Sequence, residues 1–163
     1  MTAARLFPAL VLCLALPPSG AATLADLQPP IRRDDGGMEY MAGGQDGRQR
    51  AFLERVAPQW GATLEFVAPA ALTPTDALPV EVRIVDRYRG GQVLSARAEG
   101  PLLLARLPPG TYEVEARIGP LATTQTLTVM LGVPGRLRFA WPSNVDFATL
   151  AQPRRTLAQG GLP

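Results

Sequence analysis

The sequence contains no histidine, no lysine and only one cysteine among its 163 residues. The absence of His and Lys excludes an imidazole base, a Schiff-base amine, a Ser–Lys dyad and the lysine of a phosphate-binding loop. A single Cys excludes an intrachain disulfide and a cysteine-rich zinc site. We therefore expect no enzyme activity, no cofactor and no metal site.

The sequence also lacks a large excess of charge of one sign. It has 16 Arg and 14 Asp plus Glu, and its formal net charge is +2. Arg32 and Arg33 are followed at once by Asp34 and Asp35, so these basic residues form no cluster. Nucleic-acid binding requires a clustered basic face. The sequence thus predicts no nucleic-acid partner.

Residues 1–22 have the three parts of a secretory signal peptide. Arg5 supplies the positive charge, Leu6 to Leu16 form an apolar run, and Ser19 to Ala22 offer small residues for cleavage. The run is shorter than the roughly 20 residues that a bilayer-spanning helix needs. We expect a periplasmic or secreted chain with no integral membrane span and, after cleavage, no cysteine.

Composition divides the rest of the chain into three zones. Residues 23–37 are rich in Pro, Gly and charge and predict a poorly ordered linker. Residues 38–142 carry the periodic hydrophobic signal and have the size of one small domain. Residues 143–163 lose the periodicity and predict a flexible C-terminal tail.

One segment of the periodic zone predicts a helix. Asp46 can cap a helix from Gly47 to about Gln59, and Phe52, Val56 and the adjoining Trp60 share one apolar face. Pro58 predicts that the last turn is distorted or that the helix ends just before it.

The remaining periodic residues predict seven short β-strands separated by turns. The expected strands are residues 63–67, 80–88, 93–98, 102–107, 112–118, 123–130 and 136–141. The expected turns are 89–92, 108–111, 119–120 and 134–135, with Gly110 left-handed in a type II turn. Leu137, Phe139 and Trp141 are expected to point inward. The pattern favours a mainly β sandwich with one N-terminal amphipathic helix.

Two stretches of sequence resemble known proteins. Residues 80–141, above all Leu107-Pro-Pro-Gly-Thr-Tyr-Glu-Val114, resemble the carboxypeptidase regulatory-like domain. That resemblance implies a Greek-key, prealbumin-like or transthyretin-like β-sandwich. Glu39-Tyr-Met-Ala-Gly-Gly44 followed by the helix and the sandwich is similar to small exported proteobacterial proteins, which implies a stand-alone, non-catalytic periplasmic domain.

Five residues stand out as candidates for ligand binding: Tyr40, Gly43, Gly44, Thr124 and Thr126. The two glycines precede the helix, where backbone N–H groups can hold an anion, or they only let the chain turn, since Asp46 would repel an anion. Tyr40 binds a ligand or packs on the sandwich. The threonines suit carbohydrate contact, another strand, or a plain exposed β face.

Charged residues on the expected strands offer few further options. Glu113 and Glu115 are the carboxylate pair that a glycosidase would need, but their spacing favours a solvated face. The same glutamates could contribute to a calcium site with Asp86, but the sequence shows no Asp-rich loop of the kind that such sites need. Arg136 and Arg138 are expected to protect an exposed strand edge.

These observations predict a non-catalytic binding or accessory module of the cell envelope. The expected partner is an unidentified envelope protein, met at a sheet edge or at the junction between helix and sandwich. The alternative is a polysaccharide or peptidoglycan bound on the threonine face.

Overall fold

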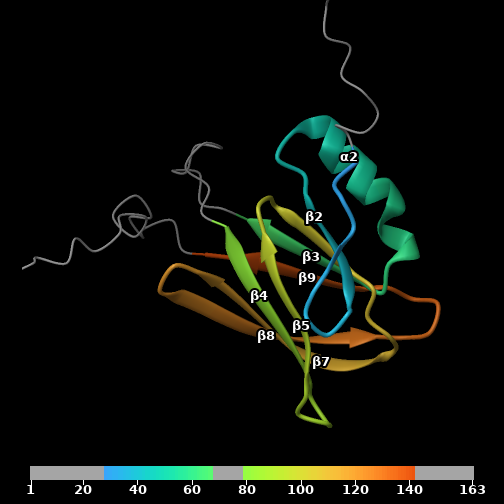
Figure 1. Ribbon diagram of the computed structural model, residues 1–163, viewed down its shortest axis with the longest axis vertical. Helices are drawn as coiled ribbons and strands as arrows, with labels where there is room; N and C mark the ends of the chain where they lie inside the picture. The colour runs from blue at the N-terminus through green and yellow to red at the C-terminus, as the bar shows by residue number, and fades with distance from the viewer. Residues whose placement is uncertain (1–27, 68–78, 142–163) are drawn as a thin grey trace, which may run out of the picture.

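The described part of the chain folds into two β-sheets packed face to face, with a short helix on the outside of one sheet (Figure 1). This architecture comes from a computed structural model that describes residues 28–67 and 79–141. The expected signal peptide, the start of the linker and the expected C-terminal tail lie outside the described residues.

The elements follow one another as β1 (Arg32–Arg33), β2 (Glu39–Gly43), helix α2 (Gly47–Val56), the 3₁₀ turn η1 (Ala57–Gln59), β3 (Ala62–Val67), β4 (Val80–Asp86), β5 (Gln92–Ala98), β6 (Leu102–Ala105), β7 (Gly110–Ile118), β8 (Leu121–Val129) and β9 (Gly135–Ala140). Sheet A has the order β1-β2-β6-β3-β9, and sheet B has the order β5-β4-β7-β8. All neighbours are antiparallel except β3 and β9, which run parallel. The predicted mainly β sandwich is confirmed.

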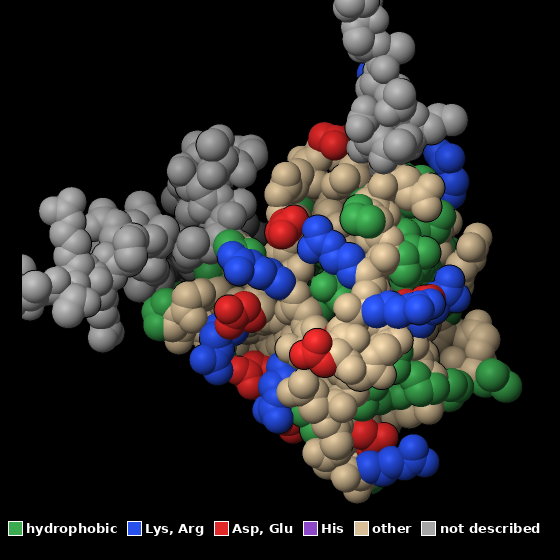
Figure 2. All heavy atoms as spheres, viewed as in Figure 1, with side chains coloured by type: hydrophobic (Ala, Val, Ile, Leu, Met, Phe, Trp, Pro, Cys, Tyr) green, Lys and Arg blue, Asp and Glu red, His purple; other side chains and the backbone are tan. Residues whose placement is uncertain are grey.

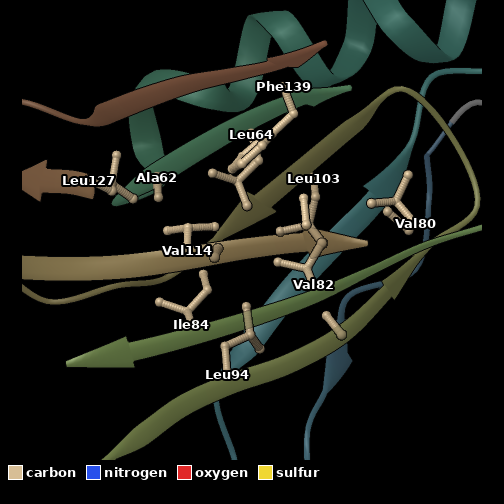
Figure 3. Close-up of a cluster of buried hydrophobic side chains, with 14 of the residues drawn as sticks. Ala62, Leu64, Val80, Val82, Ile84, Leu94, Leu103, Val114, Leu127 and Phe139 are labelled. Carbon is tan, nitrogen blue, oxygen red and sulfur yellow. The ribbon is translucent and has the colours of Figure 1, made fainter. Parts of the chain in front are cut away.

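The main core lies between the two sheets (Figure 3). Alternate residues of each strand point inward because side chains on a strand change face at every residue. Val82, Ile84 and Val114 come from sheet B, and Leu64 and Phe139 come from sheet A. Each of these five is at most 2% exposed. The predicted inward positions of β4 and β7 are confirmed.

Helix α2 covers the outer face of sheet A over β2 and β6. Its Leu53 forms a second apolar cluster with Met41, Trp60, Leu102 and Leu104. The predicted helix is confirmed at its start, where the Asp46 side chain accepts from the N–H groups of residues 48 and 49. At its end the α-helix gives way to η1, because Pro58 cannot supply the N–H that a further α-turn needs.

Gly47, the first residue of the helix, offers a stability test. A Cβ at this position would meet no atom within 4 Å, and its φ is not positive. Gly47→Ala should therefore raise the free energy of unfolding by about 0.4–1 kcal/mol, because alanine has less freedom to lose on folding. Chemical denaturation checks this, and Gly37→Ala, at a φ of 81°, is the control expected to destabilise.

The structure contains two strands that the sequence does not predict, β1 and β2. Tyr40 of β2 lies in the main core and Met41 lies under the helix, so β2 is buried on both faces and shows no alternation of apolar and polar residues. β1 belongs to the segment expected as a poorly ordered linker. That expectation is corrected for residues 28–37, where β1 pairs with β2 and leads into a turn.

The turn at 108–111 also differs from its prediction. Gly110 does not adopt a positive φ and begins β7 instead. The hydroxyl of Tyr112 donates to Pro108 O at 2.7 Å and closes the turn. A glycine fits here because a Cβ on Gly110 would lie 3.0 Å from that hydroxyl. The predicted turn at 119–120 is present, with a positive φ at Gly119. A turn also follows β4, with a positive φ at Gly90, but it spans Arg87–Gly91 and not 89–92, because β4 ends at Asp86 and β5 begins at Gln92.

Candidate functional site

A groove of about 550 Å³ lies between the β1–β2 turn and the outer face of sheet B. We call it the hairpin groove. Asp34 and Asp35 of the turn form one wall, and outward-facing residues of β4, β5 and β7 form the floor. In Figure 2, basic and acidic side chains are interspersed over β4 and β5.

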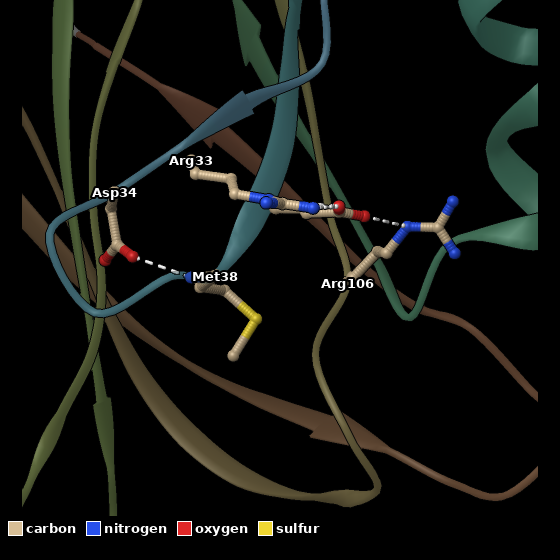
Figure 4. Close-up of polar contacts among 5 residues, drawn as sticks. Arg33, Asp34, Met38 and Arg106 are labelled. Atoms are coloured by element: carbon tan, nitrogen blue, oxygen red, sulfur yellow. Dashed lines mark hydrogen bonds and ion pairs between the residues drawn. The ribbon is translucent and has the colours of Figure 1, made fainter.

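Asp34 fixes the wall of the groove. Its Oδ1 accepts from Met38 N at 2.8 Å, which closes the β1–β2 turn (Figure 4). Its Oδ2 accepts from Ser95 N at 3.1 Å, which ties the turn to β5, the edge strand of sheet B. Because an unpaired edge N–H is a template for another strand, Asp34 also satisfies one donor of that edge.

Glu39 anchors the hairpin from the other side (Figure 4). Arg33 Nη2 lies 2.7 Å from its Oε1, and Arg106 Nε lies 2.9 Å from its Oε2. The hydrogen bond from Arg33, aided by the charges of Arg33 and Arg106, lowers the pKa of Glu39 below its ordinary value. Arg106 also stacks over Trp60, with its guanidinium carbon 4.7 Å from the ring centroid. The hairpin is therefore tied to Arg106, just after β6, and through it to Trp60, just after η1, as well as to β5.

The floor of the groove carries charges of alternating sign in two rows across the strands. In the first row, Glu81 is paired in register with Arg97 on one side and with Arg117 on the other. In the second row, Arg83 has Ser95 on one side and Glu115 on the other. Neighbouring strands are about 4.8 Å apart, so every charge has an opposite charge beside it.

Several of these charged side chains make no ion pair with other described residues. Arg117 pairs with Glu115 at 2.7 Å, which raises the pKa of Arg117. Among the described residues, Arg83 donates only to the amide oxygen of Gln92, at 3.0 Å. Arg97, Glu81 and Asp35 make no ion pair with any residue that the structure describes. The groove thus offers both positive and negative groups to a ligand.

The residues before the helix are occupied by the fold. Tyr40 is 8% exposed and packs into the main core, with one side at the edge of the groove. Gly44 has a φ of 89°, and its N–H donates to the side chain of Gln49. Gly43 abuts the same Gln49 side chain, and Asp46 takes the next helix N–H groups. The anion site expected as one option at Gly43 and Gly44 therefore lacks a free N–H at Gly44.

The expected threonine row is present on β8. Thr124, Thr126 and Thr128 are all exposed and point to the outer face of sheet B. Arg87 Nη1 donates to Thr126 Oγ1 at 3.2 Å, so one of the three hydroxyls is engaged. β8 is the second edge of sheet B, and the row is continuous with the charged floor through Glu115, which is in register with Thr124.

β9 is the second edge of sheet A, as expected from Arg136 and Arg138. Both arginines are exposed. The side chain of Gln125 on β8 donates to Arg138 O at 3.0 Å, so a polar contact joins the two sheets along this side. Charged residues and this contact protect the edge strand.

The remaining carboxylates do not form a shared site. Glu113 and Glu115 face outward from β7, and Glu115 is paired with Arg117. Asp86 accepts from the N–H groups of Tyr88 and Arg89, and these bonds lower its pKa. No group of three or more potential metal ligands occurs in residues 28–67 and 79–141. None of the helices in those residues has the length and apolarity to cross a membrane.

Comparison with known proteins leaves the family open. No family model matches the chain, and no curated protein matches it either. The resemblance to the carboxypeptidase regulatory-like domain therefore stays a prediction.

Removing the Asp34 carboxylate gives a direct test of how the groove is held. Asp34→Ala should lower the free energy of unfolding by about 1 kcal/mol, because two hydrogen bonds to a partly exposed carboxylate are lost. Amide exchange at Ser95 should become faster, since its N–H loses its acceptor. Asp35→Ala is the control, because Asp35 is exposed and makes no ion pair with a described residue. Equal exchange at Ser95 in all three proteins would contradict this role.

Proposed function

We propose that the protein is a non-catalytic binding module of the cell envelope that acts through protein–protein contact, with the hairpin groove as its contact surface. The observation that carries the proposal is the double row of alternating charges on the floor, beside Asp35 of the wall. Arg97, Glu81 and Asp35 make no ion pair with any described residue. Such a surface is complementary to a polar segment that carries both signs of charge.

The types of residue in the groove favour a protein ligand. Arginine is enriched at protein interfaces and lysine is depleted, and every basic residue of this chain is arginine. The guanidinium group can bind a carboxylate through two parallel hydrogen bonds. Complementary charges across an interface fix the orientation of a partner and exclude like-charged competitors.

The lack of catalytic residue types supports a binding role. Ser95 lies in the groove, but no histidine or lysine exists in the chain to activate it. The nearest carboxylate, Asp34, is engaged with two backbone N–H groups.

The test combines site-specific crosslinking with charge reversal. A photo-crosslinker at position 95 of the exported form (residues 23–163) should capture one dominant protein from an envelope extract. The double variant Arg83→Glu/Arg97→Glu should lose that crosslink at least about tenfold, because two positive groups of the floor become negative.

The matched control is Arg136→Glu/Arg138→Glu, which makes the same charge change on the exposed outer face of β9. This control should keep the crosslink. Equal loss in both double variants, or no loss in either, would overturn the assignment of the groove.

A second candidate function is carbohydrate or peptidoglycan binding on the threonine row of β8. It is favoured by three hydroxyl side chains that stand exposed on one face of an edge strand. In this case Thr124→Glu/Thr126→Glu would abolish retention on purified peptidoglycan, and Arg83→Glu/Arg97→Glu would leave retention unchanged.

A further inference from the structure

Exposed apolar side chains gather in two turns of the molecule. Five large hydrophobic residues are exposed in residues 28–67 and 79–141, and four of them belong to these turns. They are Tyr88 at 83%, Met130 at 59%, Leu131 at 89% and Val133 at 53%. The turns are Arg87–Gly91, between β4 and β5, and Met130–Pro134, between β8 and β9.

Both turns lie at the same end of the sandwich. Gly110 at the start of β7 is in register with Val129 at the end of β8. Thr111, the next residue, accepts from Arg87 N at 3.0 Å, where β4 leads into its turn. In Figure 1 the β4–β5 turn protrudes at the bottom and the β8–β9 turn at the right, both away from the end of β3 and the start of β4. We call this region the apolar end.

The turns hold their apolar side chains outward by their own hydrogen bonds. Met130 and Val133 exchange two backbone bonds, at 3.1 and 3.3 Å, and Gly132 between them has a φ of 74°. In the other turn, Asp86 Oδ1 accepts from Tyr88 N at 2.9 Å and from Arg89 N at 2.8 Å. The exposure of Leu131 and Tyr88 is therefore built into two closed turns.

The charge at the apolar end is positive. Arg87 and Arg89 are exposed and make no ion pair with a described residue. Neither turn contains an acid. Of the acids nearby, Asp86 is engaged with two N–H groups of the turn, and Glu113 on β7 is in register with Thr126, to which Arg87 donates at 3.2 Å. The Met130–Pro134 turn contains no charged residue.

We propose that the apolar end docks on an anionic lipid surface. Leu131 and Met130 would enter the boundary between headgroups and acyl chains, Tyr88 would lie at headgroup level, and Arg87 and Arg89 would contact lipid phosphates. Binding of this kind grows with the apolar area buried and with attraction to anionic lipids. Tyrosine is enriched at membrane interfaces because its ring is apolar and its hydroxyl is polar.

The shape of the apolar end favours a bilayer over a protein partner. The apolar side chains protrude from two separate turns, and in Figure 2 hydrophobic atoms project at the lower right of the molecule. A protein interface of standard size requires roughly 800 Å² of complementary surface from each partner. A bilayer boundary accommodates separate protruding tips without such a surface. This inference is independent of the hairpin groove, which lies on another face.

The test is co-sedimentation of the exported form (residues 23–163) with vesicles. We expect binding to vesicles of phosphatidylglycerol and phosphatidylethanolamine, and weak binding to phosphatidylcholine alone. Leu131→Asp should reduce binding about tenfold or more, because a charge replaces the most exposed apolar tip. Arg87→Gln/Arg89→Gln should reduce binding several-fold and should make it less sensitive to salt.

The control is Ile31→Asp, which puts the same charge on the one exposed large hydrophobic residue of the described chain outside the two turns, at 48% exposure. It should leave vesicle binding unchanged. Leu131→Ser, which adds no charge, should also weaken binding. No binding to anionic vesicles, or equal binding by wild type and Leu131→Asp, would overturn the proposal. If Leu131→Asp left vesicle binding unchanged but abolished binding to a protein of the envelope extract, the apolar end would be a protein-binding surface and the proposal would be overturned.

Discussion

Phe139→Ala should lower the free energy of unfolding by about 3–5 kcal/mol, the range for removing a buried phenylalanine. Phe139 is fully buried, and its ring centroid lies 5.9 Å from that of Phe66 and 6.4 Å from that of Trp141. The substitution would leave a cavity between the parallel strands of sheet A and the strands of sheet B. Such a loss is a large share of the 5–15 kcal/mol that stabilises a typical domain.

Equilibrium denaturation of Phe139→Ala beside Arg136→Ala checks this expectation. Arg136 lies on the same strand but is exposed, so its truncation should change stability by no more than about 0.5 kcal/mol. If Phe139→Ala unfolded at the same denaturant concentration as Arg136→Ala, the inward placement of β9 would be wrong.

Gly61→Ala should cost about 3 kcal/mol, because a Cβ here has no room. It would lie 2.9 Å from Leu107 N and 3.0 Å from Leu107 C, and both are backbone atoms that cannot rotate away. Gly61 cannot shift to the other side either, since its carbonyl accepts from Gly135 N at 2.9 Å at the start of β9. The close approach is therefore fixed from two directions.

Gly91→Ala is the matched control for that variant. A Cβ on Gly91 would meet nothing within 4 Å, and its φ is not positive. The melting temperature should be unchanged or slightly raised in Gly91→Ala, for the reason given for Gly47→Ala, and clearly lowered in Gly61→Ala. Equal melting of the two variants would show that the backbone at Leu107 can move.

The strands that the sequence predicts best have one solvent-exposed face and one buried face. In β4 and β7, charged residues alternate with Val82, Ile84 and Val114, and the period of two is plain. β2 is different, because helix α2 covers one of its faces and sheet B covers the other. Its pattern depends on a helix that comes later in the chain, and local alternation does not show it.

The hairpin groove cannot be predicted from the sequence, for a related reason. Its wall comes from Asp34 and Asp35, in a segment whose composition predicts a linker, and its floor comes from strands paired across β4. A partial signal is present in the charged residues that alternate along β4 and β5, but a turn at 89–92 would not set Glu81 opposite Arg97. That register follows from a loop over Arg87–Gly91 and a shift at Ile84/Val85. The contact between Asp34 and Ser95, which are far apart in the sequence, had no such signal.

The parallel pairing of β3 with β9 has a consequence for the order in which the protein folds. Sheet B is built largely from hairpins between consecutive strands, whereas β9 joins β3 only after all of sheet B has been made. Contacts between residues distant in sequence form slowly because a long loop must close first. Phe66 therefore lacks its contact with Phe139 until β9, the last strand of the described residues, has been synthesised, and we expect this side of the nascent core to expose apolar surface until then.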